Sequence, residues 1–154
     1  MTNPANFEIP DYEKKTSPIV SWDEFKTIEG MQKLIDHYNN EVDRVNGLFE
    51  NCTVLRCEPG NVSTLRNLGD PNFGRAKGND PDALATVQRS WKDGWNLNCM
   101  PPFSFEDNVR INGSHRLWDL EIREIASCPT YRVVPNEGYT REDVHNEVGL
   151  LFQP

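Results

Sequence analysis

The sequence predicts a single α+β domain in which a small mixed sheet packs against helices. Two observations lead to this class. Apolar residues recur at steps of three and four over residues 25–49, which is typical of an amphipathic helix, whereas residues 51–58 and 130–134 alternate as strands do. With 154 residues, seven Phe and four Trp, the chain can bury one sizeable core but not two.

The first predicted element is an N-terminal amphipathic helix. Ser21 and Glu24 have the spacing of a capping box, and Gly47 is a plausible end. The apolar stripe consists of Phe25, Ile28, Met31, Ile35, Tyr38, Val42, Val45 and Phe49. Two interpretations are open: the stripe packs on the rest of the domain, or it forms a seam with a partner or in a homodimer through residues 22–49. Gly30, in the middle of the stripe, weakens both.

The remaining elements follow from turn and capping residues. We expect a strand at 51–58 that residues 62–68 extend after a turn, a polar loop at 67–82, a helix at 81–92, strands at 103–105 and 109–111, a helix at 114–126, a strand at 130–134 and a short helix at 140–151. The expected organisation is a flexible arm (1–17), a helical extension (18–50), a core (51–136) and a C-terminal tail or short helix (137–154).

Charge and composition exclude several classes of protein. A net charge of −8 argues against a surface that coats DNA or an anionic membrane as a whole. No apolar run approaches the roughly 18 residues of a membrane span, and residues 1–15 do not read as a secretory signal. The four cysteines lack CxxC spacing, so we expect reduced thiols without zinc in a cytoplasmic protein.

The stretch most informative about chemistry is residues 109–120, VRINGSHRLWDL. A strand, an Asn-Gly turn and a helix start expose the first backbone N–H groups of the helix, where its dipole favours an anion. Gly113 permits the tight turn, Ser114 and His115 offer hydrogen bonds, and Arg116 offers a fork suited to phosphate. An ordinary strand-to-helix junction, with Ser114 as its cap, is the alternative.

VRINGSHRLWDL resembles the box of the ParB/sulfiredoxin-like superfamily, in which a hydrophobic strand leads to Gly-x-His/Arg-Arg and a helix. Residues 71–95, PNFGRAKGNDPDALATVQRSWKDGW, are similar to the ParB-type segment with an Asn/Pro-rich turn, an arginine and a helix. Residues 51–60, NCTVLRCEPG, are similar to its first strand, and Pro101-Pro102 matches the entry to its next strand. The resemblance covers about half of the chain and implies the same fold for the core.

The resemblance implies nucleotide-phosphate chemistry. Gly113, Ser114, His115 and Arg116 would bind the phosphates, and Arg75 would face the same pocket. Glu58, at the end of the first strand, is where kinase-type relatives use an acid, and His115 is the candidate for proton transfer. The other candidate carboxylates, for Mg²⁺ or general base work, are Glu106, Asp107 and Asp119.

Two departures from the pattern of the superfamily argue against two of its functions. The sulfiredoxin branch needs a cysteine where Ser114 stands, and segregation ParB proteins carry a helix-turn-helix after this domain, for which the residues after Val134 are too few. We therefore expect a stand-alone, phage-type ParB-like nuclease or NTP-dependent enzyme that uses Mg²⁺ and a nucleoside triphosphate.

DNA is a second expected partner, because arginines and lysines interleave with Phe73, Trp91 and Trp95. The alternative function is a non-catalytic module of the same fold that docks a protein partner, or its own copy, through the N-terminal helix.

Overall fold

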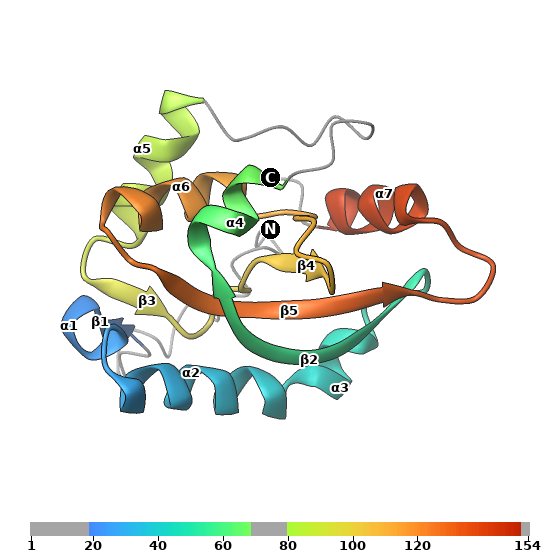
Figure 1. The fold of residues 1–154 in the computed structure, drawn as a ribbon, viewed down its shortest axis with the longest axis horizontal. Coiled ribbons are helices and arrows are strands. Elements are labelled where there is room, and N and C mark those ends of the chain that lie inside the picture. The colour runs from blue at the N-terminus through green and yellow to red at the C-terminus, as the bar shows by residue number, and fades with distance from the viewer. Residues whose placement is uncertain (1–18, 69–79, 152–154) are drawn as a thin grey trace.

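The structure, a computed structural model, describes residues 19–68 and 80–151 and has the predicted α+β class (Figure 1). In chain order its elements are β1 (Ile19–Ser21), α1 (Trp22–Phe25), α2 (Ile28–Asn40), α3 (Val42–Asn46), β2 (Cys52–Asn61), α4 (Val62–Asn67), α5 (Pro81–Ser90), β3 (Gly94–Asn96), β4 (Phe103–Phe105), α6 (Ser114–Ile122), β5 (Ser127–Pro135) and α7 (Arg141–Leu151). The expected arm at 1–17 lies outside the described residues.

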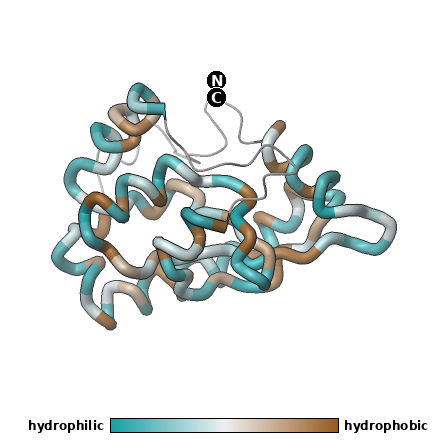
Figure 2. Tube along the Cα trace, turned by 45° about the horizontal axis from the view of Figure 1, so that its top comes forward, coloured by the Kyte–Doolittle hydropathy of each residue, from teal (hydrophilic) through white to brown (hydrophobic). Residues whose placement is uncertain are grey.

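The main sheet has the strand order β2-β5-β4, with β2 antiparallel and β4 parallel to the central β5. Helices α2 and α3 cover one face of this sheet, and α4 and α6 lie on the other (Figure 1). A second, two-stranded sheet pairs β1 with β3. Hydrophobic and hydrophilic residues alternate along the helices (Figure 2), as expected where each helix turns one side to a core.

The N-terminal helix, predicted as one element, is three helices in the structure. Its start is as expected, because the Glu24 N–H donates to the Ser21 hydroxyl at 3.2 Å. The chain then breaks at Thr27, whose hydroxyl accepts from the Gly30 N–H and caps α2, and again at Glu41 before α3. The 3.6-residue period continues across these breaks, so the sequence pattern alone does not reveal them.

Most of the N-terminal stripe is buried within the chain. Phe25, Tyr38 and Val45 are at most 3% exposed, and the Phe25 ring stacks on Trp95 with centroids 5.3 Å apart. Residues 19–50 therefore pack into the same core as the rest of the domain. Ile28, at 86% exposed, is the exception. The module hypothesis loses most of the surface on which it depended.

Other boundaries differ from the prediction. Residues 62–67 form helix α4 instead of extending the strand, because the Asn61 side chain accepts from the Thr64 N–H and caps a helix there. Helix α6 ends at Ile122, and β5 begins at Ser127. The expected strand at 109–111 is reduced to one antiparallel bridge, Ser104 to Arg110.

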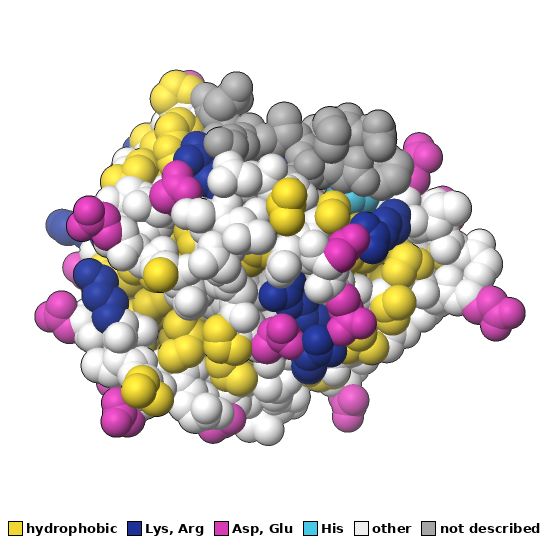
Figure 3. All heavy atoms as spheres, in the orientation of Figure 1, with side chains coloured by type: hydrophobic (Ala, Val, Ile, Leu, Met, Phe, Trp, Pro, Cys, Tyr) yellow, Lys and Arg dark blue, Asp and Glu magenta, His cyan; other side chains and the backbone are white. Residues whose placement is uncertain are grey.

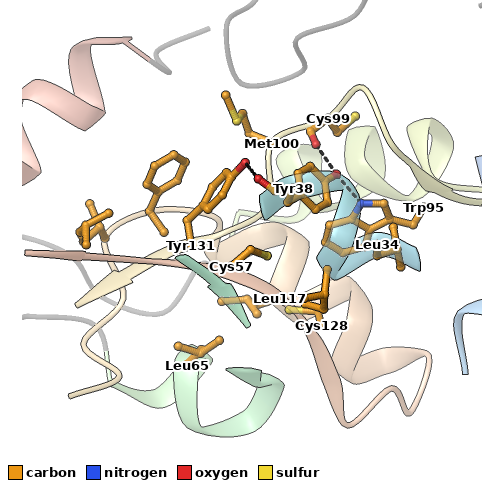
Figure 4. Packing of buried hydrophobic residues seen from close by; sticks show 14 of the residues in the cluster. Leu34, Tyr38, Cys57, Leu65, Trp95, Cys99, Met100, Leu117, Cys128 and Tyr131 are labelled. Atoms are coloured by element: carbon orange, nitrogen blue, oxygen red, sulfur yellow. Dashed lines mark hydrogen bonds between the residues drawn. The ribbon is translucent and has the colours of Figure 1, made fainter. Parts of the chain in front are cut away.

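A buried hydrogen-bond chain holds the core together (Figure 4). The Trp95 indole donates to the Tyr38 hydroxyl at 2.7 Å, and this hydroxyl donates to the Cys99 carbonyl at 2.6 Å. The Tyr131 hydroxyl donates to the Tyr38 carbonyl at 2.7 Å. These bonds join α2 to β5 and to the segment that runs from β3 towards β4, which leads on to the turn before α6.

Two asparagine side chains close the outer edge of β2. The Asn39 amide donates to the Cys57 carbonyl at 3.0 Å and accepts from the Cys57 N–H at 2.8 Å. The Asn46 amide makes the same pair of bonds with Val54, on the other side of the register shift between Val54 and Arg56. These amides occupy the backbone groups with which another strand would otherwise pair.

Replacing Asn39 with Ala is expected to lower the free energy of unfolding by about 2 kcal/mol, because the Cys57 N–H and C=O lose both partners. Urea titration followed by circular dichroism measures the change. Asn40→Ala is the matched control, since Asn40 is the next residue of the same helix and is exposed. Equal losses in the two variants would contradict an edge-closing role for Asn39.

Candidate phosphate-binding site

Helix α6 begins at a turn whose N-cap residue is a glycine. Gly113 has φ 90° and ψ 18° and has no side chain with which to cap the helix. The first hydrogen bond of the helix runs from the Leu117 N–H to the Gly113 carbonyl at 2.9 Å. The N–H groups of Ser114, His115 and Arg116 therefore precede the helical ladder, at the positive end of the helix dipole.

Gly113 is required at this turn for two reasons. Its backbone is in the left-handed region, which favours glycine. In addition, a Cβ at this position would lie 3.1 Å from Nη2 of Arg116 and 3.1 Å from Cβ of Pro102. Pro102, which precedes β4, therefore packs against the turn. The sequence around Gly113 does not indicate this contact.

Arg116 lies behind the turn, with its guanidinium hydrogen-bonded to the Met100 carbonyl. Burial lowers the pKa of this guanidinium from its ordinary value. None of the ion pairs among the described residues includes Arg116. The residue therefore anchors the chain before β4 and also places a positive charge, without a described carboxylate partner, next to the α6 N-terminus.

Ser114 and His115 occupy the first turn of α6 and are partly exposed. Nε2 of His115 accepts the Asp80 backbone N–H at 3.3 Å. Asp80 is the N-cap of α5, so the beginnings of α5 and α6 lie close together. The sequence predicts Asp80 only as a helix cap. Its proximity to His115 is a tertiary contact that the sequence does not reveal. Arg75, the remaining predicted phosphate ligand, lies outside the described residues.

The carboxylates nominated from the sequence all pair with arginines. Glu58, on β2, contacts Arg56 and lies 3.4 Å from Nε of the buried Arg132. The other pairs are Glu106 with Arg56 at 2.8 Å, Asp107 with Arg141 at 3.0 Å and Asp119 with Arg123 at 3.0 Å. Figure 3 shows acidic and basic side chains side by side on the face that carries α4 and β5.

These ion pairs affect whether the nominated carboxylates can serve as ligands of the expected Mg²⁺. No group of three or more His, Cys, Asp or Glu residues suited to a metal ion occurs in residues 19–68 and 80–151. The nominated carboxylates are neutralised by arginine and do not form a ligand set at the α6 N-terminus. The described residues thus supply no ready-made set of protein ligands for the expected Mg²⁺.

The four cysteines are buried free thiols. Burial raises the pKa of Cys52 and Cys128 to about 12 and that of Cys57 still further. Thiolates are the reactive form, so these residues serve as small core side chains. Trp91 and Trp95 are also core residues, at 2% and 0% exposed, and are not available to stack nucleic-acid bases.

In comparisons with known proteins, no family model, no curated protein and no solved structure matched this chain. Within the described part of the chain, no helix is both long enough and apolar enough to cross a bilayer.

Proposed function

We propose that this protein binds the phosphate groups of a nucleotide at the N-terminus of α6. The observation that carries the proposal is the left-handed Gly113 turn at the start of α6, backed by the Arg116 guanidinium, whose Nη2 lies next to Gly113. Both features favour an anion near Gly113, the first through oriented N–H groups and the second through a partly buried cation. Ser114 and His115 add side-chain donors at the rim of the site.

The resemblance to the ParB/sulfiredoxin-like superfamily supports a nucleotide as the source of the phosphate. Strand β2, helix α5 and helix α6 lie at positions where the resemblance implies a strand or a helix, whereas the strand that should lead into the Gly113 turn is only the Ser104–Arg110 bridge. We extend the proposal to catalysis as a ParB-like nuclease or an NTP-dependent enzyme. His115 is the proton-transfer candidate, whereas Glu58, held by Arg56 and Arg132, is not expected to act at this site.

Ser114→Asp tests the phosphate site while preserving the fold. A carboxylate in the first turn is favourable for the helix, by about 0.3–1 kcal/mol, but it repels a phosphate from the same N–H groups. Ser114→Asn, which has nearly the same shape without the charge, is the matched control. Thermal unfolding is measured with Mg²⁺ and ATP, CTP, GTP or tripolyphosphate.

At a ligand concentration of 100 times the Kd, the wild type and Ser114→Asn should gain about 2.7 kcal/mol of stability, and Ser114→Asp should gain almost none. Equal stabilisation of all three proteins would place the ligand elsewhere. If no phosphate compound stabilises the wild type, the proposal is wrong. DNA cleavage and NTP hydrolysis, assayed on the same three proteins, test its catalytic part.

A further inference from the structure

One side of α6 carries His115, Trp118 and Glu121 at three-residue spacing, which places them in one row on the helix. Trp118 is partly exposed, and its ring centroid lies 6.5 Å from that of His115. Long side chains in helices lean towards the N-terminus. Trp118 follows Ser114 by about one turn of α6, on the side of the helix that continues from His115.

Arg66 of α4 lies over one face of this aromatic ring. Its guanidinium carbon lies 5.2 Å from the centroid of the Trp118 ring, and its Nη1 donates to the Glu121 carboxylate. The Ser63 hydroxyl donates to the same carboxylate at 3.2 Å. The Trp118 ring is thus held between two helices, with a positive charge over it, and it keeps an exposed part.

We infer that the base of the bound nucleotide stacks on Trp118 while its phosphates lie at the start of α6. This inference rests on the proposed function and adds the class of ligand: a complete nucleotide rather than an inorganic phosphate. A rigid aromatic surface with an adjacent arginine is typical of base stacking, and every base has a face that can stack. Arg66, Ser63 and Glu121, the polar residues beside Trp118, already bond one another, so ATP, CTP, GTP and UTP should bind with similar affinity.

The test is a set of titrations of the full chain with the four nucleoside triphosphates and with tripolyphosphate. The wild type should bind each nucleotide about tenfold or more tightly than tripolyphosphate. Trp118→Leu should lower nucleotide affinity by the same factor and leave tripolyphosphate affinity unchanged.

Trp22→Leu is the matched control. Trp22 is also partly exposed and carries an arginine, Arg123, 4.6 Å above its ring, but it packs at the other end of α6. This variant should keep the wild-type affinities. A second measurement needs no variant: in the wild type, the nuclear magnetic resonance of the Trp118 indole N–H should shift strongly with ATP and only slightly with tripolyphosphate.

The outcomes separate the two proposals. If tripolyphosphate and nucleotides bind equally well, or if Trp118→Leu binds nucleotides as the wild type does, base stacking is overturned and the phosphate site stands. If neither kind of ligand binds the wild type, the proposed function fails, and the stacking inference fails with it.

Discussion

Replacing Gly30 with Ala is expected to lower the free energy of unfolding by about 3 kcal/mol, the upper end for an added methyl group in a packed site. Gly30 is a buried position in the first turn of α2. A Cβ there would lie 1.9 Å from the Glu24 carbonyl oxygen and 2.7 Å from the Glu24 carbonyl carbon. Because these are backbone atoms of α1, the methyl group can be accommodated only if α1 separates from α2.

Gly47→Ala is the matched control, in the same N-terminal segment. Gly47 is in the right-handed helical region, and the nearest atom to a Cβ there is the Arg44 carbonyl oxygen at 3.3 Å. Since its conformation suits alanine, this change should be close to neutral or slightly stabilising. Urea unfolding followed by circular dichroism measures both variants. A loss below about 1 kcal/mol for Gly30→Ala would show that α1 does not pack as described.

Gly30 also shows what the sequence can and cannot predict about this segment. Capping by Ser21 and an inward-facing stripe follow from local rules; in the structure the Ser21 hydroxyl accepts the Glu24 N–H, and Phe25 and Tyr38 are buried. The breaks at Thr27 and Glu41 do not follow from these rules. Glycine inside a helical pattern suggests a weak helix, whereas here it permits one backbone to approach another, which is a tertiary contact.

At the candidate site too, some features follow from the local sequence and others depend on tertiary contacts. The Asn-Gly pair predicts the turn, and the turn before α6 has the required left-handed glycine. The ion pairs of the nominated carboxylates cannot be predicted from the sequence, because they depend on sheet pairing. Glu58 pairs with Arg132 across β2 and β5, two strands that are far apart in sequence. The sequence alone does not single out Trp118, because the arginine that lies over its ring comes from α4.

Tyr38→Phe is expected to lower the free energy of unfolding by about 3 kcal/mol, although it removes a single oxygen atom. The hydroxyl is the shared partner of the Trp95 indole N–H, at 2.7 Å, and of the Cys99 carbonyl, at 2.6 Å (Figure 4). Without it, the buried Trp95 N–H loses its acceptor and the Cys99 carbonyl loses this donor, and an unsatisfied buried group costs about 1–3 kcal/mol. Burial also raises the pKa of Tyr38 well above its ordinary value, so the hydroxyl stays protonated and keeps donating.

Tyr139→Phe is the matched control for this change, because Tyr139 is 38% exposed and water replaces whatever its hydroxyl loses. We expect a change of less than about 0.5 kcal/mol there. The Tyr38 variant should also alter the fluorescence of Trp95, whose indole loses its acceptor. Equal stabilities of the two variants would mean that the Trp95–Tyr38–Cys99 chain does not hold α2 to the segment before β4. The Gly113 turn, supported by Pro102, would then owe its position to other contacts.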